Sequence, residues 1–171
     1  MFTGSPRPWQ VSWVVRRRAG SRKNMGRSGR FWLLTAPVLL CLLDNALTLC
    51  GQPAAYWAGD YIKADEGNPI ALWCLKQHPA AFAAESLLWI ALFGSLVVVL
   101  PWQLAKTVSL GVALGHIVGS AMWIGWRFEQ YWLFPVLLLS SAGLIVWTWE
   151  QAGRVRESRR AAESRNGLGT Q

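Results

Sequence analysis

The sequence predicts an all-α integral membrane protein, built as a bundle of four transmembrane helices with a short helix on the outer surface. The first observation is composition: 53% of the 171 residues are hydrophobic and only 15% are charged, which is too apolar for an ordinary soluble domain. The second is length, because a helix that crosses about 30 Å of hydrocarbon needs about 20 apolar residues. Four such runs occur. They give predicted spans at residues 31–50, 80–100, 107–126 and 131–149.

The third observation is where the 12 tryptophans fall. Tryptophan gathers at the two interfaces between a membrane and water. Nine tryptophans lie near the predicted span ends, at Trp32, Trp102, Trp147 and Trp149 on one side and Trp57, Trp73, Trp123, Trp126 and Trp132 on the other. Trp89 alone lies well inside a span. The aromatic positions therefore support the same four boundaries.

Basic residues are divided very unequally between the two sides of this bundle. Of the 17 Lys and Arg residues, eight precede residue 31, five follow residue 150 and Lys106 lies between the second and third spans, so 14 fall on one side. Loops rich in Lys and Arg stay in the cytoplasm. We therefore expect a multi-pass protein of the cell membrane with both termini cytoplasmic. No nucleic-acid recognition motif accompanies the net charge of +8, so the expected partner of this charge is the lipid bilayer.

The segments outside the spans are polar. Residues 1–30 are basic and contain no acid, which predicts a disordered cytoplasmic segment, and residues 151–171 read as a polar cytoplasmic tail after the transmembrane domain at 31–150. Met25 is followed by Gly-Arg-Ser-Gly-Arg and then by the first span, which is a complete start for a membrane protein. The sequence thus leaves open whether residues 1–24 belong to the natural protein.

Proline and capping residues mark the element boundaries. Pro37 should kink the first span or mark its regular start. Asn68-Pro69 reads as an N-cap followed by proline at the first helical position, which predicts a short helix over Pro69–Gln77. His78-Pro79 repeats this signal before the second span. Pro101 ends that span, and residues 102–106 are expected to form a tight turn, so that spans two to four run up and down in sequence.

Three glycines at four-residue spacing, Gly111, Gly115 and Gly119, lie on one face of the third span. This repeated GxxxG pattern lets another helix approach closely, so we assign the three glycines to helix packing. The sequence leaves open whether the partner is another span, a second copy of the chain or another membrane protein.

Polar side chains inside the spans are the first candidates for function, because they are costly in hydrocarbon. The candidate cluster consists of Asp44, Thr48, Glu85, His116 and Ser120. Asp44 and Thr48 share a helix face, and helix rise places Asp44 about 9 Å from the outer end of its span. Two carboxylates and a histidine at similar depth could bind a metal ion or relay protons. The plainer interpretation is that each hydrogen-bonds a neighbouring helix and fixes the packing.

Neither the cysteines nor the known catalytic signatures identify a reaction. Cys41, Cys50 and Cys74 show no CxxC spacing and read as buried small residues, although a disulfide between Cys50 and Cys74 stays open. The chain lacks HExxH, GxSxG and P-loop motifs. We predict no cofactor and leave a metal ion open. The favoured function is a structural or accessory membrane protein, and the alternative is a metal- or proton-dependent enzyme or ion-handling protein using Asp44, Glu85 and His116.

A longer pattern connects the first span to the short helix. Asp44 and Thr48 are followed by Glu66-Gly67-Asn68-Pro69, which resembles the Asp-x3-Thr and Glu-x-Asn-Pro pattern of a family of small bacterial and archaeal multi-pass membrane proteins of unknown function. Lys106 also resembles a lysine of that family. The resemblance implies a membrane location and no activity, and it adds Glu66, Asn68 and Pro69 as an outer-loop motif.

The charge asymmetry makes the topology testable with reporter fusions. Fusions at residue 30, near residue 65, at Trp102 and at the C-terminus should report inside, outside, inside and inside, because 14 of the 17 basic residues lie on the side that stays in the cytoplasm. A C-terminal fusion that reports outside would contradict the count of four spans.

Overall fold

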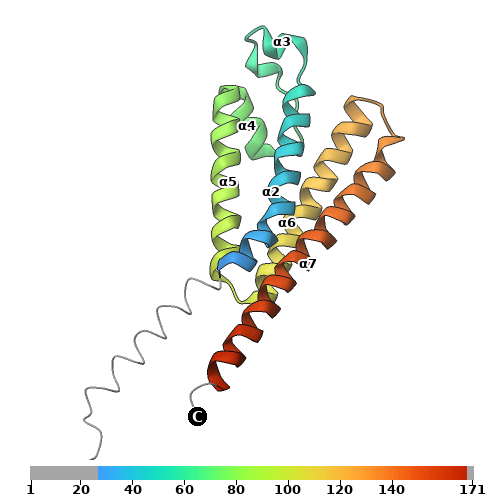
Figure 1. Ribbon diagram of the computed structural model, residues 1–171. Helices are drawn as coiled ribbons and strands as arrows, with labels where there is room; N and C mark the ends of the chain where they lie inside the picture. The colour runs from blue at the N-terminus through green and yellow to red at the C-terminus, as the bar shows by residue number, and fades with distance from the viewer. Residues whose placement is uncertain (1–26, 169–171) are drawn as a thin grey trace, which may run out of the picture.

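The structure is a computed structural model that describes residues 27–168 of the chain. Within that range every regular element is helical, which confirms the predicted all-α class. Four helices are long and apolar enough to cross a membrane. They are α2 (Arg27–Cys50), α5 (Pro79–Val99), α6 (Trp102–Met122) and α7 (Leu133–Leu168). The chain passes up and down through them, so each is antiparallel to the one before (Figure 1). Most of the predicted N-terminal segment, residues 1–26, lies outside the described residues.

Helix α2 is the centre of the bundle and contacts α5, α6 and α7. Figure 1 places α5 on one side of α2 and α7 on the other. The side chains of Leu33, Ala36 and Leu40 are buried at the three- and four-residue spacing of one helix face. Pro37 is buried within α2, which begins at Arg27. This proline therefore does not mark the start of the helix.

The two ends of the bundle differ in chemistry. The loop end carries residues 51–78 and the turn at 128–132. The opposite end, here called the basic end, carries Arg30 and the last turns of α7. There the Nη1 atom of Arg30 lies within hydrogen-bonding distance of the carbonyl oxygens of Val97, Val98 and Leu100. These are orphan carbonyls at the C-terminus of α5, and a cation is the favoured partner for them.

The predicted turn at residues 102–106 is wrong, because α6 begins directly after Pro101 at Trp102. Ala105 donates its backbone N–H to the Pro101 carbonyl at 2.9 Å, which forms the first helical turn. The Ala105 side chain is fully buried, and the Nζ atom of Lys106 lies 4.3 Å from the centre of the Trp149 ring. Contacts with other helices thus extend α6 through residues 102–106, although this segment is too polar and aromatic to be predicted as part of a span.

Helix α7 also runs past its predicted end at residue 149, as far as Leu168. Two i,i+4 ion pairs support the extension, Glu150 with Arg154 at 3.9 Å and Arg159 with Glu163 at 3.0 Å. Ala152 is fully buried in this segment. The predicted polar tail is therefore helical through most of its length.

The loop end folds into a small cap built from α3 (Ala54–Trp57), the 3-10 turn η1 (Tyr61–Lys63) and α4 (Pro69–Gln77). The predicted short helix is confirmed with its N-cap: the Asn68 side chain accepts from the backbone N–H groups of Ile70 at 3.0 Å and Ala71 at 3.5 Å. His78 caps α5 in the same way, since its Nδ1 atom accepts from Ala80 N at 3.0 Å.

The three cysteines are free. Cys50 is exposed at the end of α2, whereas Cys74 is buried in the cap beside Tyr56 and Leu75. Burial, with a smaller contribution from the charge of Glu85, raises the pKa of the Cys74 thiol. A raised pKa disfavours the reactive thiolate. Cys50 and Cys74 form no disulfide in the structure.

Helix α6 ends in a π-helical turn, η2 (Trp123–Arg127). Phe128 donates its backbone N–H to the Trp123 carbonyl at 3.1 Å, five residues earlier, which is the wider π pattern. The turn brings Arg127 back to α2, where its Nε atom donates to the Gly51 carbonyl at 2.7 Å. The C-terminus of α2 and the end of α6 are joined in this way.

Gly51 fits this junction because it lacks a side chain. A Cβ atom at Gly51 would overlap the ring of Trp123. We predict that Gly51→Ala lowers the stability of the bundle by about 1–3 kcal/mol, the usual cost of overpacking. Thermal unfolding in a nonionic detergent measures the change. Gly67→Ala is the matched control, because a Cβ atom at Gly67 would meet no atom within 4 Å. Equal stability of the two variants would contradict the close contact.

Candidate functional site

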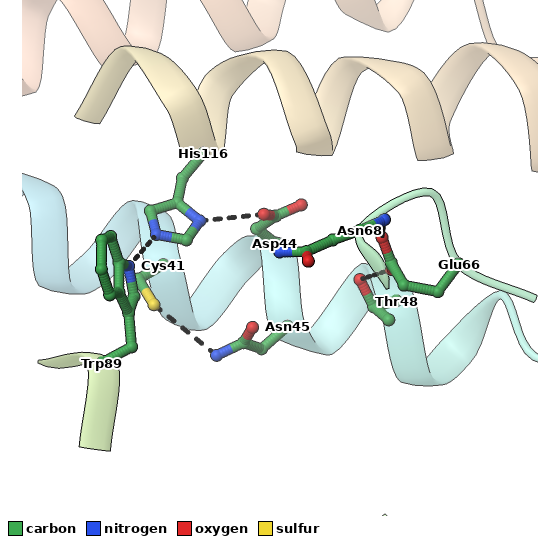
Figure 2. Close-up of polar contacts among 8 residues, drawn as sticks. All are labelled: Cys41, Asp44, Asn45, Thr48, Glu66, Asn68, Trp89 and His116. Atoms are coloured by element: carbon green, nitrogen blue, oxygen red, sulfur yellow. Dashed lines mark hydrogen bonds and ion pairs between the residues drawn. The ribbon is translucent and has the colours of Figure 1, made fainter. Parts of the chain in front are cut away.

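A hydrogen-bonded pair of an acid and an imidazole, between α2 and α6, lies at the centre of the site. The Oδ2 atom of Asp44 is 2.9 Å from the Nδ1 atom of His116. The sequence placed both residues in one candidate cluster, and the structure brings them into direct contact (Figure 2). Their side chains are 18% and 17% exposed, so the pair is largely shielded from solvent. An acid and a base at this depth satisfy each other's charge or hydrogen bonds.

Gly119 makes room for this pair. A Cβ atom at position 119 would lie 2.6 Å from Oδ2 of Asp44 and 2.7 Å from Oδ1. Only a glycine therefore lets the α6 backbone approach the carboxylate this closely. Of the three glycines assigned to helix packing, Gly119 is the one that the structure places against another helix.

Trp89 of α5 completes the set around His116. Its indole Nε1 atom donates to Nε2 of His116 at 3.3 Å. An indole can only donate, so Nε2 of the imidazole must accept. In a neutral imidazole the proton then sits on Nδ1 and is donated to Asp44. Three helices thus hold one imidazole in a defined orientation and tautomer (Figure 2).

The outer-loop motif forms a second chain of hydrogen bonds next to the pair. Thr48 Oγ1 donates to Oε2 of Glu66 at 3.4 Å, and Oε1 of Glu66 accepts the backbone N–H of Asn68 at 2.8 Å. Asn68 in turn caps α4. Figure 2 shows Glu66 and Asn68 on the loop beside Thr48, one turn along α2 from Asp44. The motif therefore links α2 to α4 and places the Glu66 carboxylate close to the end of the bundle.

Gln52 holds this loop in place, although sequence reasoning did not single it out. Its Nε2 atom donates to the carbonyls of Thr48 at 2.9 Å and Asp65 at 2.7 Å, and its Oε1 atom accepts the Asp65 backbone N–H at 2.9 Å. The Gln52 side chain is buried. A glutamine in a polar loop carries no sequence signal for such a role, because the role depends on where the chain returns in space.

These groups line one half-open cavity between α2, α5, α6 and the loop end, which we call the central cavity, with a volume of about 1060 Å³. Its acidic lining consists of Asp44, Asp65, Glu66 and Glu85. Its aromatic lining consists of Phe82, Trp89, Trp123 and Trp126. His116 and Arg127 also line it. A cavity of this size with a few convergent polar groups is the usual form of a small-molecule site.

The remaining members of the predicted cluster have different places. Glu85 lines the central cavity from α5. Thr48 is buried and also lines the cavity. Ser120 is fully buried and lies outside the cavity lining, and within residues 29–164 its hydroxyl has no protein hydrogen-bond partner. The structure therefore brings four of the five residues to one space.

Gly111 and Gly115 also line the central cavity. A Cβ atom at either position would meet no atom within 4 Å. Within a single chain these two glycines therefore open space in the cavity instead of bringing two helices into contact. The predicted glycine face thus divides into a packing position at Gly119 and two open positions.

Within the described residues, no group of three or more His, Cys, Asp or Glu side chains is arranged to hold a metal ion. Cys41 also lines the cavity, and its Sγ atom accepts from Nδ2 of Asn45 at 3.6 Å.

Comparison with known proteins finds no matching family model, no matching curated protein and no matching solved structure. The interpretation of the site therefore depends on its own geometry.

The contact between Asp44 and His116 can be measured with a double-mutant cycle. Asp44→Ala and His116→Ala should each lower the free energy of unfolding. The double variant should lose about 1–3 kcal/mol less than the sum of the two single losses, because each single variant leaves an unpaired polar partner and the double variant leaves none. Reversible unfolding in mixed detergent micelles supplies the free energies.

Ser140→Ala combined with Asp44→Ala is the control cycle, because among the described residues the Ser140 hydroxyl bonds only carbonyls of its own helix, at Val136 and Leu137. That pair should be additive. Additivity within about 0.5 kcal/mol in the Asp44 and His116 cycle as well would show that the contact contributes nothing.

Proposed function

We propose that this chain is a multi-pass membrane protein, with both termini in the cytoplasm, that binds an organic cation in the central cavity. The large exposed side chains on the outer faces of the helices support the membrane location. Leu87, Leu88 and Leu139 are among them, and each is at least two-thirds exposed. Side chains of this kind are stable in contact with lipid. The 14 basic residues on the side of the termini support the orientation.

The observation that carries the proposal is the charge of the cavity. The whole chain has a net charge of +8 and only nine Asp and Glu residues. Four of these nine carboxylates line the central cavity, against one permanent cation, Arg127. The Arg127 Nε atom is already engaged with the Gly51 carbonyl. An acidic hollow in a strongly basic protein concentrates cations, because low-dielectric walls strengthen the field inside a cleft.

The aromatic lining favours an organic cation over a bare metal ion. Trp89, Trp123 and Trp126 present indole rings to the same space as the carboxylates. Ring faces attract ammonium groups, and tryptophan does so most strongly. Carboxylates combined with tryptophans fit an amine or a quaternary ammonium group, whereas a metal site needs several converging ligand atoms.

The site is also more than a packing device. The contact between Asp44 and His116 alone would suit the structural role that the sequence favoured. Side chains that serve only to pack helices would fill the space between them. Here Gly111 and Gly115 leave space open in a cavity of about 1060 Å³, and Glu85 lines the same cavity. We therefore favour the alternative that the sequence offered, an ion-handling protein using Asp44, Glu85 and His116.

Binding of tetramethylammonium to the purified protein in a nonionic detergent tests the proposal. We expect saturable binding, followed through the fluorescence of the cavity tryptophans. Glu85→Gln and Glu66→Gln should each weaken it about tenfold, because each removes one of the four carboxylates that line the cavity.

Glu129→Gln is the matched control, since Glu129 is an exposed acid at the loop end that does not line the cavity. Equal loss of binding in all three variants would mean that general surface charge attracts the cation. No saturable binding to the wild-type protein would contradict the proposed function.

A further inference from the structure

The central cavity is much longer than a small cation needs. On α6 its lining extends from Met122 to Gly111, and η2 continues it to Arg127 at the loop end. At 1.5 Å per residue the 11 steps on α6 alone correspond to about 16 Å along the helix axis. On α5 the lining runs from Phe82 to Trp89, and on α2 from Thr48 to Cys41. The cavity is therefore an elongated space that follows the helices.

The charges are confined to one part of that space. Asp65, Glu66 and Arg127 lie at the loop end, and Asp44, Glu85 and His116 follow farther in. Beyond His116 the α6 lining consists of Gly115, Val112 and Gly111. None of these three carries a polar side chain. The cavity thus changes from acidic to apolar along its length.

The apolar part is an open hollow at its glycines. Gly111 and Gly115 are exposed, and a Cβ atom at either would have no neighbour within 4 Å, so side chains of ordinary size would fit there and fill the space. The third glycine of the same face, Gly119, is in contact with Asp44 and leaves no such space. The hollow therefore begins just beyond the Asp44 and His116 pair.

On the basis of the proposed function, we infer that the ligand is a cationic amphiphile, an amine or quaternary ammonium with a single hydrocarbon chain. Its head would lie among Glu66, Glu85 and the tryptophans, and its chain would lie against Gly115 and Gly111. Charge complementarity specifies the head, and the apolar part of the cavity specifies the chain, because burying an alkyl chain there removes it from water.

A chain-length series separates this inference from the proposed function. The probes are tetramethylammonium and the butyl-, hexyl- and octyl-trimethylammonium ions, with octyl sulfate as an anionic probe of the same chain length. For the wild-type protein we expect affinity to rise with each added methylene, by up to about fourfold. Octyl sulfate should bind at least tenfold more weakly than octyltrimethylammonium.

Gly115→Leu is the decisive variant, because a leucine there would occupy the hollow. Within this variant, the gain in affinity from tetramethylammonium to octyltrimethylammonium should disappear. Gly94→Leu on α5 is the matched control, since position 94 is equally open but does not line the cavity. It should keep the full chain-length dependence. The control also corrects for partition of the probes into the detergent micelle.

Three outcomes would overturn the inference. Tetramethylammonium binding with no gain from longer chains would leave the proposed function intact and remove the amphiphile. An equal chain-length gain in wild type and in Gly115→Leu would place the chain elsewhere. If Gly115→Leu fails to fold, Gly111→Leu serves as the second variant, and unfolding of both would show that these positions are packed, not open. Failure of every cation to bind would instead reject the proposed function itself.

Discussion

The close approach of α2 and α6 at Asp44 is the constraint on which the rest of the structure depends. Gly119 lets the α6 backbone contact the Asp44 carboxylate, and His116, one turn earlier on α6, then lies 2.9 Å from the same carboxylate. Without this pairing the acid would be buried at a cost of several kcal/mol. Once α2 and α6 are joined there, Trp89 of α5 can donate to the far side of the imidazole, and three helices share one polar contact.

The same constraint explains why a cavity exists. Helices α2 and α6 are held together at Gly119 and again where Arg127 donates to Gly51. Farther along α6, Gly111 and Gly115 have no side chains to fill the space beside the helix. The cap folds over the loop end and brings Asp65 and Glu66 to the space through Gln52 and Thr48. Acidic groups from the loop and from two helices therefore face one cavity, although they are far apart in the sequence.

Much of this fold could be predicted from the sequence, because its signals are local. Asn68-Pro69 specifies the start of α4 by capping chemistry, and the apolar runs specify the four long helices. The start of α6 at Trp102 could not be predicted in this way, because Ala105 and Lys106 continue the helix through contacts with other helices. The cavity could not be predicted either, because it also depends on contacts between helices. Asp44, Glu85 and His116 were recognisable one by one as costly polar groups, but their meeting depends on how the helices are rotated against each other. Trp89 was visible only as a tryptophan well inside a span.

A crystal structure with a heavy-atom cation would show directly whether the acidic cavity is a cation site. Crystals of the protein grown with (2-bromoethyl)trimethylammonium would locate the ligand through the anomalous signal of bromine. We predict a bromine peak inside the central cavity, close to Glu85, Glu66 and the cavity tryptophans. A closed cavity with no peak, or a peak only at exposed acids such as Glu129, would contradict it.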